Sequence, residues 1–135
     1  MNDKAFLDSN ILIYFYTNDD IGKRQKVCNI IDATSCITST QALNEVSNVW
    51  YKKFNLNGNK IKNQLDNIEL ICDEVLAIQR HTINSAIDIK DRYGCSYYDS
   101  LMLASALESK CSTIYSEDMK NGQVINNTLT ITNPF

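Results

Sequence analysis

The chain has 135 residues, which is the size of one ordinary domain. Hydrophobic residues make up 44% of the sequence, a share that excludes an intrinsically disordered chain. The formal net charge of −3 argues against a protein that binds nucleic acid through bulk positive charge, but it does not exclude a nuclease with a bound metal and a local basic patch.

The apolar residues alternate between short strand-like runs and longer helical patterns. The patterns predict five strands, at residues 5–8, 36–39, within 69–75, 112–116 and 129–132. They predict helical segments at residues 11–16, 23–32, 40 to about 54, 60–68, 82–93 and 97–108. Strands that alternate with helices indicate one α/β domain over residues 1–135, with a mostly parallel sheet.

A few residues mark helix ends and helix faces in this pattern. Thr40 is expected to cap the helix that follows it, and Gly94 fits the left-handed position just after a helix. In the helix that ends at Gly94, the side chains of Ile83, Ala86 and Ile87 are expected to face the core.

Other features bear on where the protein works. No apolar run approaches the ~20 residues that a membrane-spanning helix needs, and the first residues lack the features of a secretory signal. The five cysteines form no CxxC pair and are odd in number, which fits free buried thiols better than disulfides or a zinc site. We therefore expect a cytoplasmic protein without membrane contact.

Four acidic residues that are far apart in the sequence fall at one edge of the predicted sheet. Asp8 ends the first strand, and Glu45 lies in the first turns of the helix after the second strand. Asp99 lies in the first turn of the helix before the fourth strand, and Asp118 lies just beyond that strand. Ligands of parallel α/β sheets bind at this edge, where strands end and helices start. We call these four residues the acidic quartet.

Carboxylates gathered in this way need a counterion. Without one they repel one another and raise one another's pKa values. An all-oxygen ligand set without a His or Cys cluster suits a hard divalent ion such as Mg²⁺ or Mn²⁺. One such ion can activate water for attack on a phosphodiester, and two ions about 3.5–4 Å apart can serve both the attacking and the leaving oxygen. The quartet therefore predicts a catalytic site for one or two ions.

Each acid also has an explanation that needs no site. Asp8 could simply cap the helix that follows it, and Asp99 could be the acidic partner of Ser96 in a Ser-x-x-Asp capping arrangement. Glu45 could be a solvated helix residue, and Asp118 could be a turn residue. The placement of all four at one edge favours a common site over four separate explanations.

Five segments resemble the PIN-domain ribonucleases, and most of all the VapC-type toxins of prokaryotic toxin–antitoxin pairs: FLDSNILIY, ALNEV, YYDSLMLASAL, IYSEDM and LTITNPF. The resemblance spans essentially the whole chain. It implies a PIN-like three-layer α/β/α sandwich with strand order 3-2-1-4-5. It further implies an endoribonuclease that depends on Mg²⁺ or Mn²⁺, a cognate antitoxin whose tail lies over the active-site groove, and a homodimer.

The resemblance also assigns roles by motif position. The quartet matches the family's four acids, and Asp8 and Asp99 match its principal metal ligands. Ser116 matches a small polar residue that supports the site, and Asn10 lies beside the first acid. Glu117 stands next to the fourth acid of the quartet, and the motif favours the latter as the carboxylate that points inward.

One further segment, VWYKKFNLNGNKIK at residues 49–62, combines aromatic and basic side chains. Trp50, Lys52 and Lys53 could contact RNA or the antitoxin. Alternatively, Trp50 belongs to the core and the lysines form an ordinary solvated face. His81 is the only histidine and has no nucleophile motif beside it, so we expect a surface residue.

The favoured function is an endoribonuclease in which metal-activated water cleaves RNA phosphodiester bonds, most simply as the toxin of a toxin–antitoxin pair. One alternative is a non-catalytic binding module that keeps only the PIN scaffold. Another is an aspartyl-phosphate phosphatase with Asp8 as nucleophile, which Asn10 disfavours because such enzymes carry a second acid at that spacing.

Overall fold

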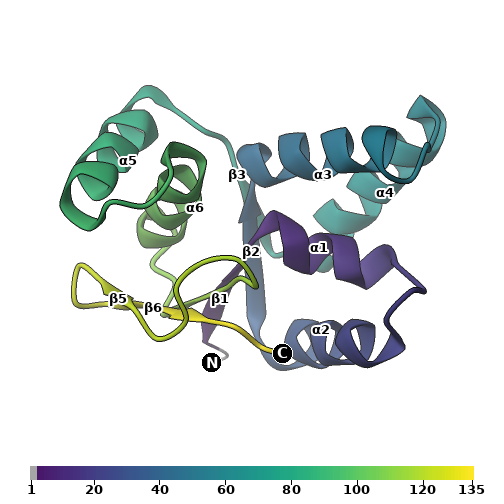
Figure 1. The fold of residues 1–135 in the computed structure, drawn as a ribbon, viewed down its shortest axis with the longest axis horizontal. Coiled ribbons are helices and arrows are strands. Elements are labelled where there is room, and N and C mark those ends of the chain that lie inside the picture. The colour runs from purple at the N-terminus through teal and green to yellow at the C-terminus, as the bar shows by residue number, and fades with distance from the viewer. Residues whose placement is uncertain (1–2) are drawn as a thin grey trace.

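A six-stranded sheet runs through the middle of the molecule, with helices on both sides of it (Figure 1). The computed structural model describes residues 3–135, so Met1 and Asn2 of the predicted domain lie outside the described residues. The strands are β1 (Lys4–Leu7), β2 (Ser35–Ser39), β3 (Glu74–Leu76), β4 (Thr113–Tyr115), β5 (Val124–Ile125) and β6 (Leu129–Thr132). The helices are α1 (Ser9–Tyr16), α2 (Ile21–Ala33), α3 (Thr40–Lys52), α4 (Gly58–Ile71), α5 (Arg80–Tyr93) and α6 (Tyr97–Glu108).

The strand order is β3-β2-β1-β4-β6-β5. The five predicted strands therefore stand in the predicted order, because the fifth of them is β6. The additional strand β5 is two residues long and pairs antiparallel with β6, whereas the other pairings are parallel. Leu7 pairs with Tyr115, so Asp8 and Ser116 leave their strands at the same edge of the sheet.

The core forms where the central strands meet α6. Ala5, Phe6 and Leu7 of β1 are all buried, as expected for a parallel strand covered on both faces. In α6, every residue from 100 to 106 is buried, so this helix is enclosed nearly all round. It contacts β2 and β4 on one side and α5 on the other (Figure 1). This buried helix carries Asp99 in its first turn.

The structure corrects three local predictions: the extent of the third strand, the inward side chains of α5 and the cap of α3. The run at residues 69–75 does not hold the third strand alone, because α4 continues through Ile71 and the strand is Glu74–Leu76. The helix continues because Ile61, Gln64 and Ile68 bury one face at helical spacing. Ile87 is 45% exposed, since the inward face of α5 runs through Thr82, Ala86 and Ile89.

The cap of α3 also differs from the prediction. The Ser39 hydroxyl, rather than Thr40, accepts the backbone N–H of Ala42 at 3.3 Å. The expected left-handed residue after α5 is confirmed, because Gly94 has φ 75°.

The five cysteines are free thiols, and the prediction of burial is confirmed for Cys36, Cys72 and Cys111, whereas Cys28 and Cys95 are only partly buried. Within residues 3–135, none of the helices combines the length and the apolar character needed to cross a lipid bilayer.

Candidate active site

Asp8 lies at the centre of the site, between the end of β1 and the start of α1. Its side chain is 3% exposed and caps α1 by accepting the backbone N–H of Ser9 at 2.7 Å. The Ser116 hydroxyl donates to its second oxygen at 2.7 Å. The capping role predicted as an alternative for Asp8 is therefore real, and it coexists with contacts to residues more than 100 positions away.

Asn10 joins the first and the last acid of the quartet. Its Nδ2 group donates to Asp118 at 3.1 Å and, more weakly, to Asp8 at 3.4 Å. Its Oδ1 atom accepts the backbone N–H of Glu117 at 3.2 Å. The Asn10 amide thus ties α1 to the loop that follows β4, which places Asp118 beside Asp8.

Ser116 anchors the same loop, the one that follows β4, through hydrogen bonds of its hydroxyl. Besides donating to Asp8, its hydroxyl oxygen accepts the backbone N–H groups of Asp118 at 3.3 Å and Met119 at 3.2 Å. Ser116 is fully buried, so few other hydrogen-bond partners are within reach of its hydroxyl. This one side chain therefore sets both the rotation of the Asp8 carboxyl group and the start of the turn that carries Asp118.

Glu45 reaches the site from the first turns of α3. The Ser9 hydroxyl donates to it at 2.8 Å and lies 3.5 Å from Asp8. Gln41 donates to its other oxygen at 3.1 Å. The hydroxyl of Ser9 therefore bridges two of the acids that the sequence analysis grouped together.

Within residues 3–135, the Asp99 side chain makes no hydrogen bond to another acid of the quartet. The Ser96 hydroxyl accepts its backbone N–H at 3.2 Å and so caps α6, as predicted. Burial raises the pKa of the Asp99 carboxyl, and the charge of Asp118 raises it further, against a lowering by the Ser96 hydroxyl.

Burial raises the pKa of Asp8 to about 6. The hydrogen bonds from Ser116 and Ser9 act in the opposite direction, and the charges of Glu45 and Asp99 raise the pKa again. The mutual influence of these carboxylates is what a shared site requires.

The quartet is not gathered into a ready-made ligand cluster. Within residues 3–135, no three His, Cys, Asp or Glu side chains stand close enough together to hold a metal ion as they are placed. Polar neighbours, namely Ser9, Asn10 and Ser116, instead link three of the acids. Nevertheless the donor chemistry fits a hard divalent cation, because Asp8 is a buried carboxylate and no described Lys, Arg or His forms an ion pair with any of the four acids.

Glu117 has its side-chain partners outside the quartet, in a network that no sequence pattern indicates. Its carboxylate forms an ion pair with Lys23 and accepts a hydrogen bond from the Tyr14 hydroxyl at 2.7 Å. The Lys23 ammonium also lies over the rings of Tyr14 and Phe135. Burial alone would raise the pKa of Glu117, but the contacts with Lys23 and Tyr14 lower it. The Asp118 side chain, rather than that of Glu117, accepts the hydrogen bond from Asn10, and no local sequence signal marks Lys23 as the partner of Glu117.

The segment at residues 49–62 has mixed outcomes. Trp50 is 2% exposed and packs edge-on against Tyr16, so the interpretation of Trp50 as a core residue is confirmed. Lys52 and Lys53 are exposed. His81 is exposed as expected and lies 3.4 Å from Glu108.

A cavity of about 430 Å³ opens beside the acids. Its lining includes Asn10, Asp118, Lys53 and Phe54. A neighbouring cavity of about 250 Å³ shares Ile13, Thr17 and Phe54 with it. Three shared lining residues therefore place the two cavities next to each other, and we call the pair the hollow beside the quartet; of the four acids, Asp118 lines it.

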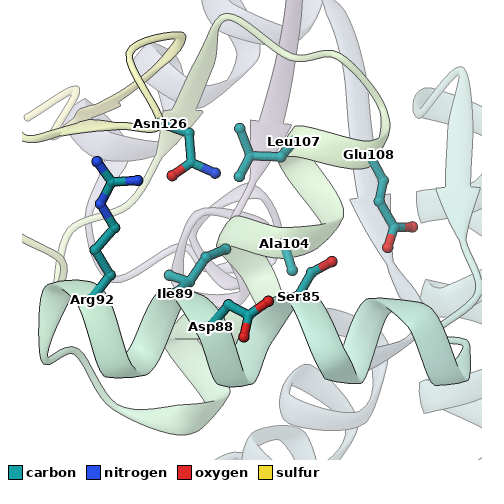
Figure 2. Close-up of a pocket in the computed structure, with 8 residues that line it drawn as sticks. All are labelled: Ser85, Asp88, Ile89, Arg92, Ala104, Leu107, Glu108 and Asn126. Atoms are coloured by element: carbon teal, nitrogen blue, oxygen red, sulfur yellow. The ribbon is translucent and has the colours of Figure 1, made fainter.

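A separate cavity of about 400 Å³ lies over α5 and α6 (Figure 2). Ser85, Asp88 and Arg92 of α5 follow one of its walls, and Asn126 lies across from them (Figure 2). None of the four acids lines this cavity.

Comparison with known proteins places this geometry in a family. Residues 5–122 match the family described as PIN domain. The search of curated proteins found no match to the sequence.

Three solved structures illustrate the likeness of the fold. A toxin–antitoxin complex from Klebsiella pneumoniae has a TM-score of 0.72 at 17% identity, with 97% of this chain and 98% of that chain covered. The sarcin-ricin loop cleaving toxin VapC20 from Mycobacterium tuberculosis has a TM-score of 0.67 at 14% identity, with 84% of this chain and 89% of that chain covered. VapBC2 from Rickettsia felis, bound to a promoter DNA fragment, has a TM-score of 0.67 at 14% identity, with 96% and 99% covered.

Proposed function

Because this chain belongs to the PIN domain family, we propose that it is a metal-dependent endoribonuclease that cleaves RNA phosphodiester bonds. The observation that carries the proposal is the state of Asp8. This carboxylate is buried, and the charges of Glu45 and Asp99 raise its pKa. It has no cationic partner among the described residues. A protein that needed Asp8 only as a helix cap would be more stable with a neutral cap residue, since burying an unpaired charge is unfavourable.

The four acids of the quartet would hold one or two ions of Mg²⁺ or Mn²⁺, with Asp8 and Asp99 as the principal ligands. When bound, such an ion lowers the pKa of water and stabilises negative charge on a phosphodiester. Ser116 and Asn10 act on Asp8 itself, because their hydrogen bonds keep its carboxyl group at one rotation. Asn10 also keeps Asp118 facing the same hollow.

We further propose that the protein is the toxin of a toxin–antitoxin pair. The support comes from the shared fold, since the similar structures include a toxin–antitoxin complex from Klebsiella pneumoniae and a toxin from Mycobacterium tuberculosis. On this proposal a cognate antitoxin covers the hollow beside the quartet, the toxin forms a homodimer, and both work in the cytoplasm. Lys52 and Lys53 remain candidates for contact with RNA or antitoxin, because they are exposed and Lys53 lines the hollow.

The absence of a preformed three-acid cluster in residues 3–135 favours one rival, a non-catalytic binding module on the same scaffold. An assay with purified protein and a pool of transfer and ribosomal RNAs separates the two. Parallel reactions contain Mn²⁺, Mg²⁺ or EDTA. The Asp99→Asn variant tests the site, and Asp91→Asn, which changes an exposed acid of α5, is the matched control.

We expect cleavage with Mn²⁺ or Mg²⁺ and none with EDTA. Asp99→Asn should lose at least about 100-fold in rate, since loss of a ligand exceeds the 10–100-fold effect of residues that only support ligands. Asp91→Asn should match the original protein. Absence of cleavage by folded protein that binds Mn²⁺ in a direct titration, on every RNA of the pool, would favour the binding module.

A further inference from the structure

The smaller cavity next to the acids has the chemistry of a binding site in its own right. Its volume is about 250 Å³, and aromatic side chains from three segments, Tyr16, Trp50 and Phe54, contribute to its walls. Lys60 lies at the same cavity and is exposed. Phe54 also lines the larger cavity that Asn10 and Asp118 share, so the two cavities are neighbours.

Gln64 is the unusual member of the lining. It projects from α4, is 8% exposed and has a buried Nε2 atom without a hydrogen-bond partner among the described residues. Its backbone carbonyl accepts the Tyr16 hydroxyl at 3.2 Å, which fixes the helix but leaves the side chain free. A buried amide donor without a partner is unfavourable, and a ligand that brings an acceptor into the cavity removes that penalty. The Nε2 atom is enclosed, and rotation about the broad terminal torsion of the side chain would turn this donor towards the ligand.

We propose that this cavity receives one unpaired base of the RNA substrate, next to the phosphodiester that is cleaved, and that Gln64 hydrogen-bonds to the edge of this base. The inference rests on the proposed function. A nucleobase is flat, stacks on aromatic rings, carries hydrogen-bond acceptors on its edge and is attached to a phosphate that attracts lysine. Phe54 supplies the stacking surface, while Lys53 and Lys60 supply the positive charge.

The same features restrict the class of RNA. A base that is stacked and paired inside an A-form helix cannot enter a side cavity, so the substrate must present an unpaired nucleotide in a loop, bulge or single strand. An apolar side chain of a protein partner would fill the volume of the cavity but would leave the Gln64 amide without an acceptor. The observations therefore favour a base over an apolar side chain as the occupant of the cavity.

Binding can be tested without catalysis, which separates this inference from the proposed nuclease. The probes are four tetranucleotides of sequence UUNU, in which N is each of the four bases, and a fifth in which N is an abasic ribose. They are titrated in EDTA into the full chain. Two reporters sit at the cavity: the side-chain amide signals of Gln64 in ¹H–¹⁵N spectra and the fluorescence of Trp50, the single tryptophan. A short apolar peptide, acetyl-Ala-Leu-Ala-amide, is titrated in parallel.

We expect at least one base at position N to shift both reporters saturably, with the abasic probe at least tenfold weaker. Gln64→Met should weaken binding about tenfold through the lost hydrogen bond. Asn67→Met, which removes an exposed amide from the same helix, should not. Phe54→Ala changes a partly exposed residue and tests the same cavity if Gln64→Met does not fold.

The inference is wrong if the abasic probe shifts the reporters as strongly as the others, or if none of the RNA probes shifts them. It is also wrong if only the peptide does so, in which case the cavity is a protein-docking surface. Base binding at Gln64 without any metal-dependent cleavage would support the base site and remove the nuclease.

Discussion

Asp8 and Glu117 are carboxylates at the same edge of the sheet, but they differ in burial, in hydrogen-bond partners and in the direction of their pKa shifts. Asp8 is 3% exposed and all of its hydrogen-bond donors are neutral groups. Glu117 is partly exposed and accepts from the Lys23 ammonium and the Tyr14 hydroxyl. Burial accordingly raises the pKa of Asp8 to about 6, whereas the contacts with Lys23 and Tyr14 outweigh burial and lower the pKa of Glu117.

The difference separates Glu117, whose charge stabilises the fold, from Asp8, whose charge destabilises it. Glu117 has its counterion within the chain, so its charge helps to hold α2 against the loop after β4. Asp8 has hydrogen bonds that orient it but no cation, so its charge opposes folding. A group that is oriented and left uncompensated is typical of a functional site, where an outside partner completes it. The following experiments test this contrast.

The largest expected effect is on the stability of the metal-free protein as pH changes. The folded-state pKa of Asp8 is about 6 against an ordinary value of 3.8, so the unfolded chain ionises first as the pH rises. Stability is therefore lost between about pH 4 and pH 7, by roughly 3 kcal/mol in total. Denaturant unfolding in EDTA across this pH range measures the loss, and Asp8→Asn should flatten that part of the profile. An identical profile for the two proteins would show that Asp8 is not the buried charge we infer.

A slightly smaller effect is expected when a divalent cation is supplied. If an ion is the missing partner of Asp8, Mn²⁺ at 100 times its dissociation constant should stabilise the folded chain by about 2.7 kcal/mol. The stabilisation should be greater at pH 7.5 than at pH 5, because the ion binds the ionised carboxylate.

Thermal unfolding with and without Mn²⁺ checks this prediction. Asp8→Asn should lose the response, and Glu117→Gln should keep it, because Glu117 is already paired with Lys23. A response that survives in Asp8→Asn would place the ion elsewhere.

The contrast between the two carboxylates also shows what the sequence could predict. The alternation of strands and helices, the order of the five long-range strands and the position of the acids relative to the sheet follow from local patterns and from the PIN resemblance. The side chains that decide each acid's environment do not. Lys23 contacts Glu117 across 94 positions and Ser116 contacts Asp8 across 108, and neither spacing is a local signal.

The end of α4, the short strand β5 and the burial of Gln64 escaped prediction for a related reason. Helix α4 continues through Ile71 because one of its faces packs on the core. An apolar run alone does not distinguish the end of a helix from a strand. The two-residue strand β5 exists only because the turn at Asn126 and Asn127, both with positive φ, folds it back on β6. Gln64 is polar in sequence and buried in the fold, so its amide could be noticed only in the structure.

The smallest expected effect comes from Glu117, and its sign is opposite to that of Asp8. Glu117→Gln should lower the free energy of unfolding at pH 7 by less than about 1 kcal/mol, the range of exposed ion pairs. Because the folded-state pKa of Glu117 is lowered, this contribution is present above the unfolded pKa and is lost as the pH falls through the folded one. The difference in stability between Glu117→Gln and the original protein should therefore vanish at low pH. The difference between Asp8→Asn and the original protein also vanishes at low pH, but it has the opposite sign at pH 7. Unfolding curves at matched pH values measure how the stability difference between each variant and the original protein changes with pH. If both differences changed in the same direction, the assignment of Lys23 as the counterion of Glu117 alone would be contradicted.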